Sequence, residues 1–110
     1  MKKTSLIVKE WFASKKASEL GRRVYTNDVF AILAKSEKAV KVLCASDSTG
    51  KMTFWAPKSV LDISTFDNEK NEYNELHADA SQIEEMINNM PVKTYEEAVA
   101  DYNEEMSLYR

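Results

Sequence analysis

The chain has 110 residues, the size of one ordinary domain with a modest hydrophobic core, and its net charge of −3 hides an uneven distribution. Residues 1–61 carry twelve Lys or Arg and five Asp or Glu, whereas residues 62–110 carry three and thirteen. The lack of an apolar run of about 18 residues excludes a membrane-spanning helix, and a single cysteine excludes an intramolecular disulfide. Because the basic start of the chain lacks the apolar region of a signal peptide, we expect a cytoplasmic protein with no membrane partner.

The first half of the chain is predicted to be mainly β-strand. Residues 5–8, Ser-Leu-Ile-Val, are apolar and rich in β-branched side chains, and they lead into Trp11 and Phe12. Residues 29–34 form a continuous apolar run that is short enough for a buried strand. Good N-cap residues precede this run at positions 26–28, so a helix starting at Val29 is an open alternative.

A β-hairpin is predicted over residues 38–56. Val40, Val42 and Cys44 alternate with side chains of the opposite face, residues 47–50 supply turn chemistry, and an extended, aromatic-rich run then ends at Pro57. The alternation places Cys44 on the inward face, which predicts a buried and unreactive thiol. It also places Phe54 and its neighbour Trp55 on opposite faces, so at least one of them is expected in the core.

The second half of the chain is predicted to contain an acidic loop over residues 65–80 and then two helices. Ser81 and Glu84 have the spacing of a capping box at the start of a helix that Pro91 closes. Thr94 and Glu97 repeat this spacing at the start of a second helix. The apolar positions at helical spacing are Ile83, Met86, Ile87 and Met90 in the first helix, and Tyr95, Val99, Tyr102, Met106 and Tyr109 in the second.

We therefore predict an α+β fold in which a small antiparallel β-sheet, formed by the N-terminal half, packs with two C-terminal α-helices. Residues 1–110 are predicted to form a single domain. Its parts are a basic, mainly β region (1–64), the acidic loop (65–80) and two acidic helices (81–110).

Residues suited to catalysis or metal binding are scarce. His77 is the only histidine, and no Ser or Cys motif accompanies it to form a nucleophilic triad. One Cys and one His cannot supply the roughly four nitrogen or sulfur ligands of a structural zinc site. Asp67, Glu69 and Asn71 match the opening of a calcium loop, but Glu72 stands where that loop needs glycine. We therefore expect no enzyme activity, no catalytic residue, no metal and no cofactor.

A basic, aromatic surface is one of two candidate binding surfaces. Lys51, Trp55 and Lys58 place an aromatic ring among cations on the predicted hairpin, an arrangement that can stack bases and neutralise phosphates. Arg22 and Arg23 add a second basic cluster. These five residues are the candidates for contact with nucleic acid.

An acidic surface is the other candidate. Asp101, Glu104 and Glu105 lie in the last turns of the final predicted helix, where the negative end of the helix dipole and mutual repulsion disfavour carboxylates. Glu97 lies on the same side of this helix, opposite the tyrosines. We predict that this face binds a protein partner together with the carboxylates of the preceding loop, namely Asp67, Glu69, Glu72 and Glu75.

The residues around the predicted hairpin resemble the small accessory open reading frames of Gram-positive phages and mobile elements. The similarity covers residues 36–42 and 54–60, and it includes a W-x-P-K-S ending of the hairpin at residues 55–59. Small acidic proteins in that setting include inhibitors of host defence, such as anti-CRISPR proteins, which occupy the nucleic-acid channel of a nuclease. The resemblance carries no catalytic residue over to this chain.

Three functions are open on these observations. The first is a non-catalytic phage or mobile-element protein that inhibits a basic host protein, such as a nucleic-acid-guided nuclease, because an acidic surface can mimic a nucleic-acid backbone. The second is a small nucleic-acid-binding accessory or regulatory protein that uses the basic, aromatic hairpin. The third, which the sequence supports least, is an enzyme that uses His77 or a carboxylate pair. Self-association through the oppositely charged halves is compatible with each of them.

Overall fold

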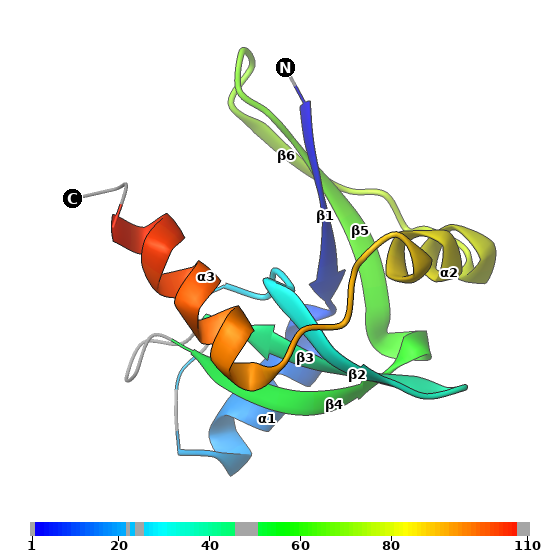
Figure 1. Cartoon of the computed structure of the whole chain (residues 1–110). Coiled ribbons are helices and arrows are strands. Elements are labelled where there is room, and N and C mark those ends of the chain that lie inside the picture. The colour runs from blue at the N-terminus through cyan, green and yellow to red at the C-terminus, as the bar shows by residue number, and fades with distance from the viewer. Residues whose placement is uncertain (1, 22, 24–25, 46–50, 108–110) are drawn as a thin grey trace.

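The computed structural model describes residues 2–21, 23, 26–45 and 51–107, with the backbone alone for residues 2, 3, 106 and 107 (Figure 1). These residues form two three-stranded antiparallel sheets and three α-helices, two of which are C-terminal. The predicted α+β class is confirmed. The strands, however, extend over most of the chain and are not confined to its N-terminal half.

The first sheet has the strand order β1–β5–β6 and joins the start of the chain to its middle. Leu6 lies opposite Ile63 and Val8 opposite Leu61, and these four side chains bury one face of the sheet. Because successive residues of a strand point to opposite faces, Asp62 lies on the other face. The strands are β1 (Lys2–Val8), β5 (Leu61–Asp67) and β6 (Glu72–Glu75).

The second sheet has the strand order β2–β3–β4 and contains the predicted hairpin. Val40 lies opposite Ala56 and Val42 opposite Phe54, which confirms the predicted alternation. Cys44 is fully buried, and burial, with a smaller contribution from Asp28, raises the pKa of its thiol from 9.0 to about 12. The predicted turn at residues 47–50 lies outside the described residues. The strands are β2 (Ala31–Lys35), β3 (Ala39–Cys44) and β4 (Met52–Pro57).

The segment that could have been strand or helix is strand β2. The backbone before it is already extended, because Val29 N–H donates to Leu6 O (2.8 Å) and Asp28 forms an isolated β-bridge with Ile7. The N-cap residues at 26–28 therefore lie along β1 and do not start a helix.

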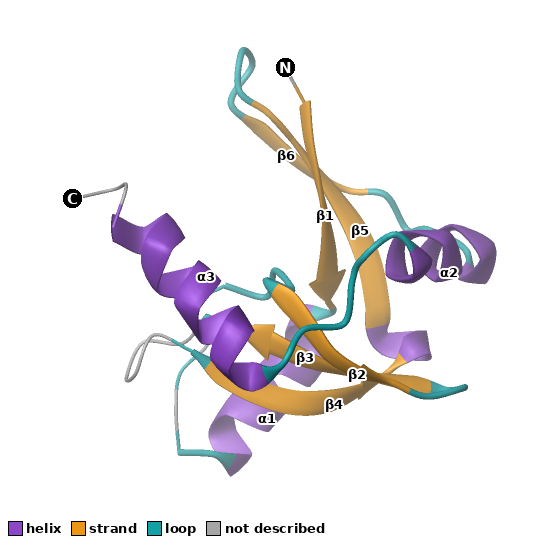
Figure 2. Ribbon diagram, in the orientation of Figure 1, coloured by secondary structure: helices purple, strands orange, loops and turns teal. Residues whose placement is uncertain are grey.

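The two C-terminal helices pack against different sheets (Figures 1 and 2). α2 contacts β1 and β5, whereas α3 contacts β2. The helices are α1 (Glu10–Glu19), α2 (Ala80–Asn88) and α3 (Tyr95–Ser107), and a short 3-10 helix, η1 (Lys58–Val60), links β4 to β5. None of the helices in the described part of the chain is long and apolar enough to span a bilayer.

Helix α1 is absent from the sequence-based prediction. Its buried side consists of Phe12 and two small residues, Ala13 and Ala17, so the hydrophobic period is weak. The helix ends before Gly21, whose φ of +69° is a left-handed conformation that glycine adopts without strain.

The acidic loop predicted over residues 65–80 is wrong for much of its length. β5 continues to Asp67, and β6 pairs with residues 64–67 to form a second hairpin. Asp67 Oδ1 accepts hydrogen bonds from the backbone N–H groups of Glu69 (3.0 Å) and Lys70 (3.3 Å), and Asn71 takes a left-handed φ of 53°. These polar turn contacts, and no hydrophobic alternation, define the hairpin.

Of the two predicted N-caps, one is wrong and the other is confirmed. The capping box predicted at Ser81 is wrong, because Asp79 accepts from Gln82 N–H (2.9 Å) and the Gln82 side chain accepts from Asp79 N–H (3.0 Å). The cap predicted at Thr94 is confirmed, since its hydroxyl accepts from the backbone N–H of Glu97 at 3.1 Å.

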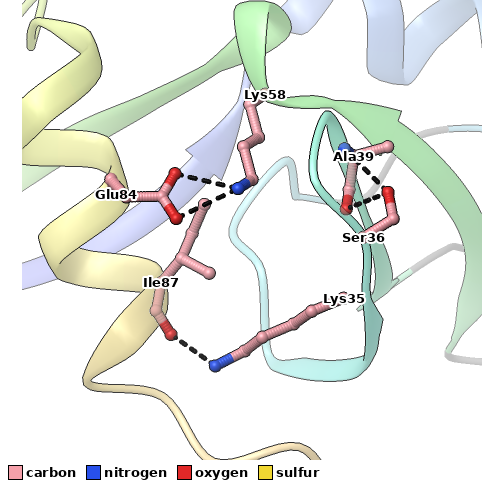
Figure 3. Close-up of polar contacts among 6 residues, drawn as sticks. All are labelled: Lys35, Ser36, Ala39, Lys58, Glu84 and Ile87. Atoms are coloured by element: carbon pink, nitrogen blue, oxygen red, sulfur yellow. Dashed lines mark hydrogen bonds and ion pairs between the residues drawn. The ribbon is translucent and has the colours of Figure 1, made fainter.

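Two lysine side chains connect the segment of α2 to the rest of the fold (Figure 3). Lys35 belongs to β2 of the second sheet, and Lys58 belongs to η1, which follows β4. Lys58 Nζ donates to both carboxylate oxygens of Glu84, at 3.0 and 2.8 Å. Lys35 Nζ donates to the carbonyl oxygens of Ile87 and Met90, each at 2.9 Å. A cation at these carbonyls satisfies acceptors that a helix end leaves without a partner.

The hydrophobic core has two parts. The larger part lies between the sheets and takes side chains from α1 and α2, including Phe12, Ile83 and Ile87. The smaller part lies under α3, where Ala98 and Tyr102 pack on Ala31, Leu43 and Ala45 of the second sheet. Tyr95 was predicted on the apolar face of α3 but is 51% exposed, so that part of the predicted face is wrong.

Candidate functional site

The predicted acidic face of α3 is only partly available to a partner. Glu97 Oε1 accepts a hydrogen bond from the Thr94 hydroxyl (3.1 Å) at the start of the helix. Asp101 Oδ2 accepts from Lys93 Nζ at 2.5 Å. A lysine of the preceding loop therefore pairs with Asp101 despite the position of this carboxylate near the end of the helix. Glu104 is exposed and Glu105 is half-buried near the end of the helix.

The second predicted group of carboxylates lies on the β5–β6 hairpin. Asp67 is half-buried and shapes the turn, as described above, whereas Glu69, Glu72 and Glu75 are exposed. All four residues of β6 are exposed, and β6 is an edge strand of the first sheet. The hairpin therefore presents side-chain carboxylates beside the outer edge of the first sheet, which no other strand of the described residues pairs with.

The eight predicted partner-binding residues belong to two separate projections of the fold. α3 lies over the second sheet, whereas the hairpin is the end of the first sheet (Figure 2). Each projection is acidic by itself, because α3 contains no lysine and the hairpin, residues 61–75, contains only Lys70. A partner can contact one projection without the other.

The described residues of the predicted basic, aromatic surface have different surroundings in the structure. Lys58 forms an ion pair with Glu84, and Arg22 lies outside the described residues. Arg23 is exposed and Lys51 is half-buried at the start of β4. Trp55 is 45% exposed while Phe54 is buried, which confirms that their side chains point to opposite faces.

A basic partner for Trp55 that the sequence reasoning missed is Lys41. The two residues are a cross-strand pair of β3 and β4, so their side chains lie on the same face of the second sheet. The alternation of the hairpin contained this signal, because Lys41 stands between Val40 and Val42 and so falls on the face opposite them.

A third group of polar residues was not predicted as a site. It lies on the face of the first sheet that carries Asp62 and Ser64, the two buried polar residues of the described chain. Tyr73 is 49% exposed, and the partial burial of its side chain raises its pKa; a hydrogen bond with Ser64 opposes the rise, and the carboxylates of Asp28, Glu75 and Asp62 add to it. His77 Nδ1 lies 4.0 Å from Asp62 Oδ2.

These residues were missed because residues 65–80 were predicted to be a loop. Once β6 is recognised, Tyr73 and Glu75 lie on one face by strand periodicity, whereas His77 lies beyond the end of the strand with a left-handed φ of 51°. The alternating spacing of Tyr73 and Glu75 was the available signal.

No family model, no curated protein and no solved structure matches this chain.

Proposed function

We propose that the protein is a non-catalytic binding protein whose carboxylates engage a basic host protein that normally binds nucleic acid. An RNA-guided nuclease is the partner class that fits best, because such enzymes hold a heteroduplex in a positively charged channel. The protein would then act as an anti-CRISPR-like inhibitor of phage or mobile-element origin that occludes this channel.

The exposed carboxylates of the β5–β6 hairpin are the observation that carries the proposal. Glu69 lies within the tight turn at the end of the sheet, where its N–H donates to Asp67 Oδ1, and Glu72 begins β6, where it pairs with Asp67. A narrow, acidic hairpin can enter a groove that accepts a phosphate backbone. Glu104 on α3 supplies a further exposed carboxylate on the other projection.

The test is competition between this protein and target DNA on a panel of purified RNA-guided nucleases. We expect DNA cleavage by at least one member to be inhibited, with inhibition that weakens as salt rises from about 50 to about 500 mM because exposed charges are screened. The hairpin variant Glu69→Gln with Glu72→Gln should weaken inhibition by at least about tenfold, the loss expected when close charge pairs are removed.

The matched control removes two exposed carboxylates from the basic half of the chain, as Glu10→Gln with Glu37→Gln. This control changes the net charge by the same amount, so it should inhibit like the parent protein. Equal weakening by both variants would show that net charge, and not the hairpin, governs the effect. Failure of every nuclease to bind at low salt contradicts the proposal.

A second candidate function is binding of single-stranded nucleic acid, and the pairing of Trp55 with Lys41 favours it. An exposed indole beside a cation on a sheet face is the arrangement on which a base can stack. Stacking on one aromatic ring contributes about 1–3 kcal/mol per base.

Tryptophan fluorescence separates this candidate from the first. Trp55→Ala should abolish binding of a short oligonucleotide at about 50 mM salt, and Lys41→Gln should weaken it and reduce its salt dependence. Trp11→Ala is the control, because Trp11 is 61% exposed on α1, a different element. No fluorescence change with DNA or RNA would dismiss this candidate.

A further inference from the structure

Three metal-binding side chains converge on one face of the β5–β6 hairpin. Glu75 is the last residue of β6 and lies opposite Ser64. Two positions further on is His77, beside Asp62, which precedes Ser64 by two positions. One ligand atom from each of Asp62, Glu75 and His77 lies within 4.8 Å of the other two.

The Asp62 carboxylate is the fixed member of this group. Its side chain is only 2% exposed, and Oδ1 accepts hydrogen bonds from the backbone N–H groups of Ile63 and Ala78, both at 2.8 Å. These two bonds hold the carboxylate plane and leave Oδ2 directed toward His77.

Among the residues that the structure describes, no donor forms a hydrogen bond with the buried Oδ2 of Asp62. His77 Nδ1 lies 4.0 Å from Oδ2, which is too far for a hydrogen bond, and a Glu75 carboxylate oxygen lies within 4.8 Å of the Asp62 carboxylate. Leaving a buried charged oxygen without a partner is costly, and native structures place a donor, a water or an ion at such a position. The exposed His77 and Glu75 side chains beside it are both metal ligands by type.

We infer that Asp62, Glu75 and His77 form a site for one divalent transition-metal ion, with Zn²⁺ as the best match. Imidazole selects zinc and its neighbours over magnesium and calcium, whereas the two carboxylates supply charge. Three protein ligands leave at least one coordination position for water or for an external ligand.

The required movement is small. Zinc binds nitrogen and oxygen ligands at about 2.0–2.2 Å, so tetrahedral ligand atoms are about 3.4 Å apart. His77 and Glu75 are exposed and can rotate by the remaining distance, while Asp62 stays fixed by its two backbone donors. This inference does not rest on the proposed inhibitor function, because it concerns the Asp62 face of the hairpin and a different ligand.

The test is titration of the chelator-treated full chain with ZnCl₂ by calorimetry, and with Co²⁺ by visible absorption. We expect one ion per chain. His77→Ala and Glu75→Gln should each weaken binding by at least about tenfold, since even residues that only support a ligand cost about 10- to 100-fold. Because His77 is the single histidine, its NMR resonances should shift with saturation at one equivalent.

Glu72→Gln is the matched control, because Glu72 lies on the same strand and pairs with Asp67, on the face opposite Glu75. It should bind zinc within about twofold of the parent protein, as expected for a surface charge outside a coordination shell. If Glu72→Gln weakens binding as much as Glu75→Gln, the ion is held by general surface charge and the site is refuted. Unchanged affinity in His77→Ala, or no binding by the parent protein, also overturns the inference.

Discussion

Replacing Asp62 tests whether its buried carboxylate organises the junction between β6 and α2. Oδ1 joins the backbone of β5 to the N–H of Ala78, directly before the N-cap residue Asp79. Asp62→Ala removes the acceptor and leaves these two donors without it. Asp62→Asn keeps an oxygen at the same place and removes only the charge.

The expected sizes follow from these two hydrogen bonds. A hydrogen bond to a charged group contributes about 1.5–3 kcal/mol net, and the Ala78 bond is half-exposed. We therefore expect Asp62→Ala to lower the free energy of unfolding by about 2–4 kcal/mol. Asp62→Asn should lower it by about 1 kcal/mol or less, because the amide oxygen can accept from Ala78.

Urea denaturation followed by circular dichroism, in the presence of a chelator, measures both changes. His77→Ala serves as the control, since His77 is 85% exposed and its loss should change stability by about 0.5 kcal/mol or less. A loss below about 1 kcal/mol for Asp62→Ala would refute the role of Asp62 as the organiser of this junction. With zinc at about 100 times its dissociation constant, the free energy of unfolding of the parent protein should rise by about 2.7 kcal/mol, and that of either Asp62 variant should rise by less.

Three further predictions concern the core and the caps. The raised pKa of Cys44 means that the folded state keeps the thiol proton between pH 9.0 and about 12 while the unfolded state loses it, so stability should fall as pH rises through this range. From this group, the free energy of unfolding should fall by about 1 kcal/mol per pH unit. Cys44→Ala should flatten this decline, as measured by urea midpoints. A thiol reagent at pH 8 should modify Cys44 only after unfolding. Thr94→Ala should lower the free energy of unfolding by about 0.5–2 kcal/mol, because α3 loses its N-cap. Ser81→Ala, inside α2, should not change it measurably. Equal effects of the two substitutions would contradict the assigned caps. Leu43→Ala should lower the free energy of unfolding by about 2–5 kcal/mol, because it opens a cavity under α3. A negligible change in thermal denaturation would contradict the packing of α3 on the second sheet.

Local sequence signals predicted several elements correctly. The alternation of Val40, Val42 and Cys44 defined strand β3 because one face of a strand must be buried and the other need not be. Thr94 marked the start of α3 because its hydroxyl satisfies a backbone N–H that a helix leaves free. The same alternation predicted that Phe54 and Trp55 point to opposite faces and that at least one of them is in the core, and Phe54 is buried there.

The errors arose where a local signal competed with a distant contact. Ser81 is a good N-cap residue, but Asp79 takes that role because the N–H of neighbouring Ala78 is fixed by Asp62, sixteen residues earlier. β6 has no hydrophobic alternation to reveal it, since all four residues are exposed and only backbone pairing with β5 makes it a strand. The α3 carboxylates were interpreted without Lys93, whose reach to Asp101 depends on the path of the loop.

The sequence by itself therefore determined the α+β class, the central hairpin with its buried thiol, the start of the last helix and the division of charge between the two halves. These properties depend on the residues of each segment and their neighbours. Only the tertiary structure decided that the acidic segment is a hairpin and that Asp62, Glu75 and His77 share one face. The physical reason is that strand register places residues side by side that the chain separates, and no local pattern encodes the register of the polar strand β6 on β5.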